Sequence, residues 1–71
     1  MTDTVALRDL IDSKGLKLGF IAESLGLSGY GFSLKLNNKN EFKASEIATL
    51  CNMLEIAPEE MDRIFFAKGD D

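Results

Sequence analysis

The chain has 71 residues, of which 45% are apolar and 28% are charged, and its formal net charge is −4. This length allows one small domain without a second core, and the composition is typical of a compact globule rather than a disordered chain. Apolar runs are too short to span a bilayer, and the N-terminus lacks the basic and apolar regions of a signal peptide. The single Cys excludes an internal disulfide and favours a reducing compartment. We therefore expect one cytoplasmic domain over residues 1–71, with no membrane contact.

Apolar residues at helical spacing predict five helices and no strand. The first helix covers about residues 4–14, with Asp3 or Thr4 as its N-cap and Gly15 as the left-handed residue that ends it. The second helix covers about residues 18–25 and is predicted to be short, because a glycine follows it directly.

The third helix covers about residues 28–36 and follows a turn at Gly26, where a positive φ is needed. Ser28 is the predicted N-cap, since its hydroxyl can accept a hydrogen bond from the first turn. Phe32 and Leu36, four residues apart, are expected to form the inner face of this helix.

Phe42, in the polar loop after the third helix, is expected to reach the core. A fourth helix is predicted over about residues 44–54, and a last helix over about residues 58–67 begins at Pro58, with two acids in its first turn. The inward positions of these two helices are Ile47, Leu50, Cys51 and Leu54, then Met61, Ile64 and Phe65. The tail, residues 68–71, is expected to fray.

Charge is distributed unevenly along the chain. Residues 14–43 carry five lysines against two acids, a net charge of +3, whereas residues 44–71 carry a net charge of −5. The net charge of the whole chain opposes nucleic-acid binding, but the field of a local patch matters more than the total. The middle of the chain therefore predicts a basic surface, although such lysines also occur on ordinary solvated surfaces.

The segment IAESLGLSGYGFSLKLNNK, which starts at Ile21, resembles the helix-turn-helix of the phage repressor and Cro-like family, also called the xenobiotic-response-element-like family. The shared pattern is a small residue, Ala22, then Gly26 four residues later, an apolar residue and the capping Ser28. Asn37 follows the third helix, as an Asn often does in that family, and the similarity continues through EFKASEIATLCNMLEI. The resemblance implies an all-α, five-helix lambda-repressor-like fold.

The resemblance also implies a function: a prophage-related transcriptional regulator that places its third helix in the major groove of double-stranded DNA, often as a dimer. The family pattern puts base-facing residues at Ser28, Gly29, Tyr30, Ser33 and Leu34. It puts phosphate contacts at Lys17, Lys35, Asn37, Asn38, Lys39 and Lys43.

The helix-turn-helix departs from the family at three positions, one in its second helix and two in the third. Leu18 stands where members frequently have Gln or Thr, Gly29 where they place a long polar side chain, and Leu34 where many have Arg. None of the predicted base-facing residues is a bidentate reader of guanine or adenine. We therefore expect weak or shape-dependent specificity, with Tyr30 either a reader of bases or an aromatic residue at the rim of the core.

An enzyme is not expected, because the chain has no His, no set of ligands at metal spacing, and no cofactor motif, the glycines of GLSGYG having the wrong order for a dinucleotide fingerprint. The alternative to a DNA reader is a protein-interaction module, an antirepressor or regulatory subunit that binds through its acidic surface and Phe66. A second copy of the chain is a further candidate partner, through Met61, Phe65 and Phe66. Adjacent helical residues point about 100° apart, so Phe66 either meets such a partner or wraps over the core.

Overall fold

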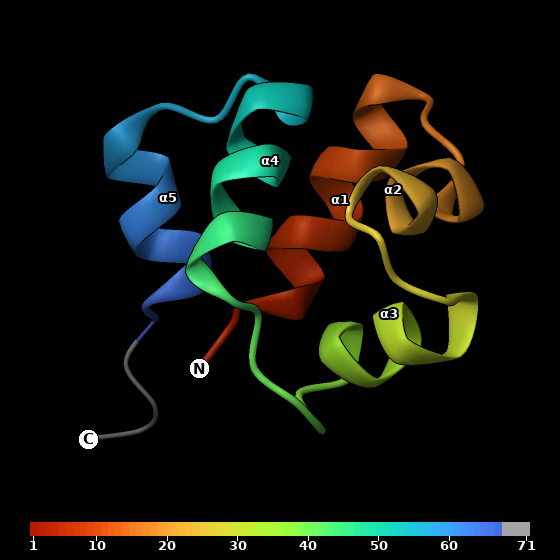
Figure 1. The fold of residues 1–71 in the computed structure, drawn as a ribbon. Coiled ribbons are helices and arrows are strands. Elements are labelled where there is room, and N and C mark those ends of the chain that lie inside the picture. The colour runs from red at the N-terminus through yellow and green to blue at the C-terminus, as the bar shows by residue number, and fades with distance from the viewer. Residues whose placement is uncertain (68–71) are drawn as a thin grey trace.

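The computed structural model describes residues 1–67, which form an all-α fold of five helices without a strand (Figure 1). The helices are α1 (Thr4–Lys14), α2 (Leu18–Ser24), α3 (Gly29–Leu36), α4 (Ala44–Leu54) and α5 (Pro58–Phe65). The tail that was expected to fray, residues 68–71, lies outside the described part of the chain. Residues 1–67 contain no helix with the length and apolar character needed to cross a membrane.

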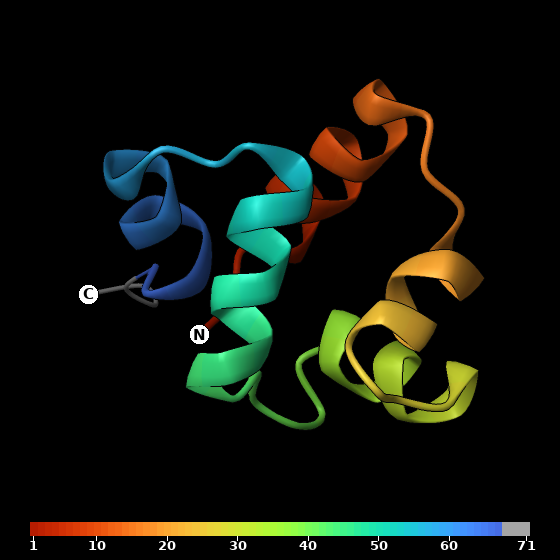
Figure 2. The same cartoon turned by 45° about the horizontal axis from the view of Figure 1, so that its top comes forward.

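The five helices are arranged around a central pair. Both views place α1 and α4 in the middle, the α2–α3 pair on one side and α5 on the other (Figures 1 and 2). The outer surfaces of α3 and α5 therefore lie on opposite sides of the molecule, although both helices pack on one core.

Local capping signals set the helix ends. Asp3 accepts a hydrogen bond from the Ala6 N–H at 3.1 Å and so is the N-cap of α1, and Gly15 ends that helix with a φ of 70°. Gly26 has a φ of 72° in the turn before α3, and the Ser28 hydroxyl oxygen accepts from the Gly31 N–H at 3.0 Å. The capping predictions are confirmed.

Three helix ends differ from the predicted ends. α2 ends at Ser24 rather than at residue 25, and Leu25 is its C-cap, directly before the left-handed Gly26. α3 begins after Ser28, whose extended backbone, with a ψ of 162°, makes it a cap and not a helical residue. α5 ends at Phe65, since Phe66 turns out of the helix with a φ of −120°.

The core lies where all five helices meet and contains Leu7, Ile11, Ile21, Ala22, Phe32, Leu36, Phe42, Ile47, Leu50, Leu54, Ile56, Ile64 and Phe65. Phe42 reaches this core from the loop, as predicted, and its ring packs edge-on against Phe32 and Phe65 at centroid distances of 6.2 and 5.8 Å. Edge-to-face pairs are favourable beyond the area they bury. Phe42 thus connects the loop after α3 to both α3 and α5.

Ile56, in the loop before α5, is also buried, although the helical spacing did not predict it as a core residue.

Two apolar residues are less buried than predicted. Leu18 is the first residue of α2 and is 44% exposed, because that helix turns its inner face toward the core only at Ile21 and Ala22. Cys51 is half-buried at the edge of the α4 stripe, and burial raises the pKa of its thiol. A raised pKa keeps the thiol protonated and unreactive.

Candidate nucleic-acid interface

The α2–α3 pair is joined by a short, fully hydrogen-bonded turn. The Leu27 N–H donates to the Ala22 carbonyl at 2.9 Å, and the Gly26 N–H donates to the Glu23 carbonyl at 3.0 Å. Ala22 is buried where the two helices approach, and a small side chain suits such a crossing. The turn and the Ser28 cap together fix the direction in which α3 leaves α2.

The outer face of α3 is open to solvent. Of the residues predicted to face bases, Ser28, Gly29, Tyr30 and Ser33 are exposed, and Leu34 is half-buried. Tyr30 is 76% exposed, so it belongs neither to the core nor to its rim. Its ring and hydroxyl form the largest free side chain on this face, because its neighbours on either side are glycines.

Five of the residues predicted to contact phosphate are exposed: Lys17, Asn37, Asn38, Lys39 and Lys43. Asn37 lies at the C-terminal end of α3, where its amide donates to the Ser33 carbonyl at 2.8 Å. Its amide oxygen accepts from the Arg8 guanidinium at 3.3 Å. Arg8 comes from α1 and joins this surface only through the fold.

Arg8 was missed by the sequence analysis because it stands in an acidic stretch of the chain. A signal was present in the helical phase: Arg8 lies between Leu7 and Ile11, the two buried residues of α1, at the edge of the stripe that packs on the rest of the domain. An exposed cation at such an edge can reach over a neighbouring helix.

Lys35 does not contribute to this surface, and its prediction as a phosphate contact was wrong. Its ammonium nitrogen lies 2.6 Å from the Glu46 carboxylate, and only 9% and 7% of the two side chains are exposed. Lys35 belongs to the inner face of α3, between Phe32 and Leu36, whose phase carries it toward the start of α4. A buried charge needs a partner, and Glu46 supplies it.

Glu46 connects two elements through one carboxylate oxygen, which accepts from Lys35 and from the backbone N–H of Lys43 at 2.8 Å. Burial by itself raises the pKa of this carboxyl group, but the hydrogen bonds and the positive charge of Lys35 together outweigh it, so the pKa of Glu46 is lowered from its ordinary value of 4.5. The ion pair thus attaches α3 to the N-terminal turn of α4 in the charged state.

Asn38 also has a structural role that the sequence analysis did not assign. Its amide oxygen accepts from the Thr2 N–H at 3.3 Å, and its amide nitrogen donates to the Thr2 carbonyl at 2.9 Å. Its φ is 58°, a left-handed conformation that Asn tolerates better than most residues. The oxygen and one N–H of the Asn38 amide therefore hold the N-terminal segment, while a phosphate contact by this exposed residue stays a prediction.

The three residues predicted to meet a second copy differ in accessibility. Phe65 is buried against Phe42, as its inward position predicted, and is therefore not accessible to a second copy, and Met61 is half-buried. Phe66 is 59% exposed and lies beside a cavity of about 240 Å³ that Met1 also lines. Phe66 is the member of the three that a partner can reach.

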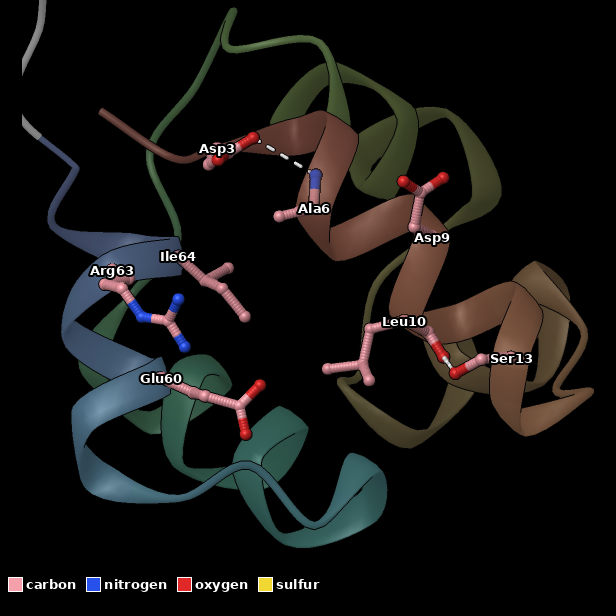
Figure 3. Close-up of a pocket in the computed structure, with 8 residues that line it drawn as sticks. All are labelled: Asp3, Ala6, Asp9, Leu10, Ser13, Glu60, Arg63 and Ile64. Carbon is pink, nitrogen blue, oxygen red and sulfur yellow. Dashed lines mark hydrogen bonds between the residues drawn. The ribbon is translucent and has the colours of Figure 1, made fainter.

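A cavity of about 400 Å³ lies between α1 and α5, away from the α3 surface. Figure 3 shows Glu60 and Arg63 of α5 reaching toward it, with Asp9 and Leu10 on the α1 side. Asp3 also lines it, so the cavity is lined by three carboxylates and one guanidinium. This charge disfavours a polyanion, and within residues 1–67 no group of three His, Cys, Asp or Glu side chains is placed to hold a metal ion.

A family model described as "Protein of unknown function (DUF739)" matches residues 7–68. The chain belongs to this family. Searches of curated proteins and of solved structures gave no match. The matched range of the DUF739 family includes the whole of α2 and α3, together with Arg8 and the Lys35–Glu46 pair.

Proposed function

We propose that the chain is a DNA-binding transcriptional regulator of the phage repressor and Cro type, prophage-related, with a lambda-repressor-like helix-turn-helix made by α2 and α3. One observation carries this function: the outer face of α3 is open beside the exposed cations Arg8 and Lys17, on a helix whose first turn is capped by Ser28. A helix held in this way can enter the major groove with its N-terminal residues on base edges.

The distribution of charge supports this docking direction. The exposed cations Arg8, Lys17 and Lys39 lie on or beside the α2–α3 pair, and the acids of residues 15–43, Glu23 and Glu41, are also exposed. At the opposite side, α5 and the turn before it carry Arg63 against four acids, a net charge of −3: Glu55, Glu59, Glu60 and Asp62. A polyanion is therefore attracted by one side of the molecule and repelled by the other.

Base recognition by this face is expected to be weak. Tyr30 can stack or donate a hydrogen bond, and Ser33 can bond to either a donor or an acceptor. Neither forms the bidentate contact that discriminates bases by about 1–3 kcal/mol. Affinity then comes mainly from phosphate contacts, and sequence preference from DNA shape and from apolar contacts.

The test is binding of the full chain to a mixed-sequence duplex, measured by fluorescence anisotropy over a range of salt concentrations. Four exposed cations, Arg8, Lys17, Lys39 and Lys43, predict a slope of log K against log salt of roughly −3 to −4. Lys17→Glu and Lys39→Glu should weaken binding to all sequences alike, whereas Tyr30→Ala should narrow the gap between a selected site and random DNA.

Lys14→Glu is the matched control, because Lys14 lies 3.4 Å from Glu55 at the far end of α1 and should affect DNA binding less than the other two reversals. Absence of any binding at about 50 mM salt, where phosphate contacts are strong, would reject the DNA-binding function. It would favour the protein-interaction module, for which the exposed Phe66 and the acidic α5 side are the available surface.

A further inference from the structure

A small hollow opens between α1, α2 and α3 on the proposed DNA-facing side. Its volume is about 100 Å³, and it is lined by Arg8, Leu18, Gly19, Gly29, Phe32, Ser33 and Leu36. Phe32 and Leu36 are buried core residues and form its floor, and the exposed Leu18 forms one wall. We call this feature the α3 hollow.

Two of the residues that line the α3 hollow are glycines, Gly19 and Gly29. A Cβ added to either glycine would meet no atom within 4 Å, so neither is required by close packing. Neither position supplies a side chain that could fill the hollow, which leaves room for a group from outside.

The charges around the α3 hollow indicate what kind of molecule supplies that group. Arg8 is the charged residue among its lining residues, and no carboxylate lines it. The other two cavities described above are lined by Asp3, Asp9 and Glu60, and by Glu41. An apolar hollow with a cationic rim complements an apolar group that is carried on an anion.

We infer that the α3 hollow receives the 5-methyl group of a thymine, an inference that rests on the proposed docking of α3 in the major groove. Thymine is the standard base that presents a methyl group there, and it does so on a strand whose phosphates Arg8 can reach. Burial of the methyl group against Leu18 and the core floor removes apolar surface from water. The chain then prefers thymine without any bidentate side chain.

The test compares two duplexes that differ only in this methyl group: an alternating A·T duplex and the same duplex with deoxyuridine in place of thymidine. The wild-type chain should bind the thymine duplex about fourfold more tightly, the factor expected for burying one methyl group. Equal binding to both duplexes would overturn the thymine inference and leave DNA binding intact. Binding to neither would reject the proposed function itself.

Two variants locate the contact. Leu18→Gln makes the wall of the α3 hollow polar, and it should reduce the ratio of the affinities for the thymine and deoxyuridine duplexes to about one. Val5→Gln makes polar an apolar residue of α1 that is 69% exposed and does not line the α3 hollow, and it should leave the preference unchanged. A thymine preference that survives Leu18→Gln, or that is lost in Leu34→Gln instead, would place the methyl contact elsewhere and overturn the assignment. A preference for 5-methylcytosine duplexes without one for thymine would also overturn it.

Discussion

The two faces of α3 differ in burial and in the number of contacts that they make. The inner face carries Phe32, Lys35 and Leu36, all buried, and even its one charged group is satisfied by a partner 2.6 Å away. The outer face carries Gly29 and Tyr30, which make no hydrogen bond to another helix and are exposed to solvent. One helix of eight residues thus has an inner face whose contacts are fixed by the core and an outer face that makes no such contacts.

The difference separates what positions the helix from what it can recognise. Contacts on the inner face set where α3 lies, because buried groups tolerate little change in volume or charge. The outer face is free to vary without altering the fold, since exposed substitutions usually change stability by less than about 0.5 kcal/mol. Substitutions on the two faces should therefore have effects of different size and kind.

Lys35→Met tests the inner face and should have the largest effect. The substitution leaves the Glu46 carboxylate buried with only the Lys43 N–H as a partner, and removal of one member of a buried pair costs about 3–5 kcal/mol. A core of this size supplies only about 3–5 kcal/mol of net stability. Equilibrium urea unfolding should show most of the stability lost.

The double variant Lys35→Met, Glu46→Gln is the matched control. The introduced amide would be neutral and could still accept from the Lys43 N–H, as a glutamine does in a capping box. Replacement of both charges should therefore recover stability to within about 1 kcal/mol of the wild type, since a well-packed neutral pair can replace a buried ion pair. A single variant as stable as the wild type would show that the pair does not hold α3.

Lowering the pH tests the same ion pair with a smaller expected loss of stability, because protonation removes the charge of Glu46 but leaves its side chain in place. Folding lowers the pKa of Glu46 below 4.5, so the contribution of the pair is fully present above that value. The contribution is lost as the pH falls through the lower, folded-state pKa. Urea unfolding between about pH 7 and pH 3 should therefore show a larger decrease in the free energy of unfolding for the wild type than for the double variant. The other carboxylates contribute equally to the pH dependence of both proteins.

The helix ends and the buried faces were largely predictable from the sequence, because their causes are local. Asp3, Gly15 and Ser28 act on backbone groups within a few residues, and the periodicity of α4 needs only α4 itself. The burial of Lys35 depends on Glu46, which comes from another helix. Its phase, one residue before Leu36 and three after Phe32, already indicated the edge of the inner face.

The candidate site was predicted less completely for the same reason. Exposure of Tyr30 and Ser33 follows from the phase of α3, but the contribution of Arg8 requires α1 and α3 to meet, and no local pattern expresses that contact. Asn38 was assigned to phosphate from the family resemblance, whereas its left-handed backbone and its hydrogen bonds to Thr2 arise only in the folded chain.

The two glycines in the first turn of α3 give the smallest expected effect. A Cβ at position 29 meets no atom, so Gly29→Ala should raise the free energy of unfolding by about 0.5 kcal/mol through helix propensity and loss of unfolded-state entropy. A Cβ at position 31 lies 3.2 Å from the Ser28 hydroxyl oxygen, the N-cap of α3. Gly31→Ala should gain less, because the cap must move.

A double-mutant cycle isolates this contact. Ser28→Ala removes the hydroxyl and costs about 1 kcal/mol as a lost cap. In that background Gly31→Ala no longer meets an oxygen and should give the same gain as Gly29→Ala gives in the wild type. Thermal and urea unfolding of the four proteins measure the difference. An equal gain from Gly31→Ala with and without Ser28 would show that the first turn of α3 accommodates a methyl group freely, and that its outer face is even less constrained than the contact with the cap implies.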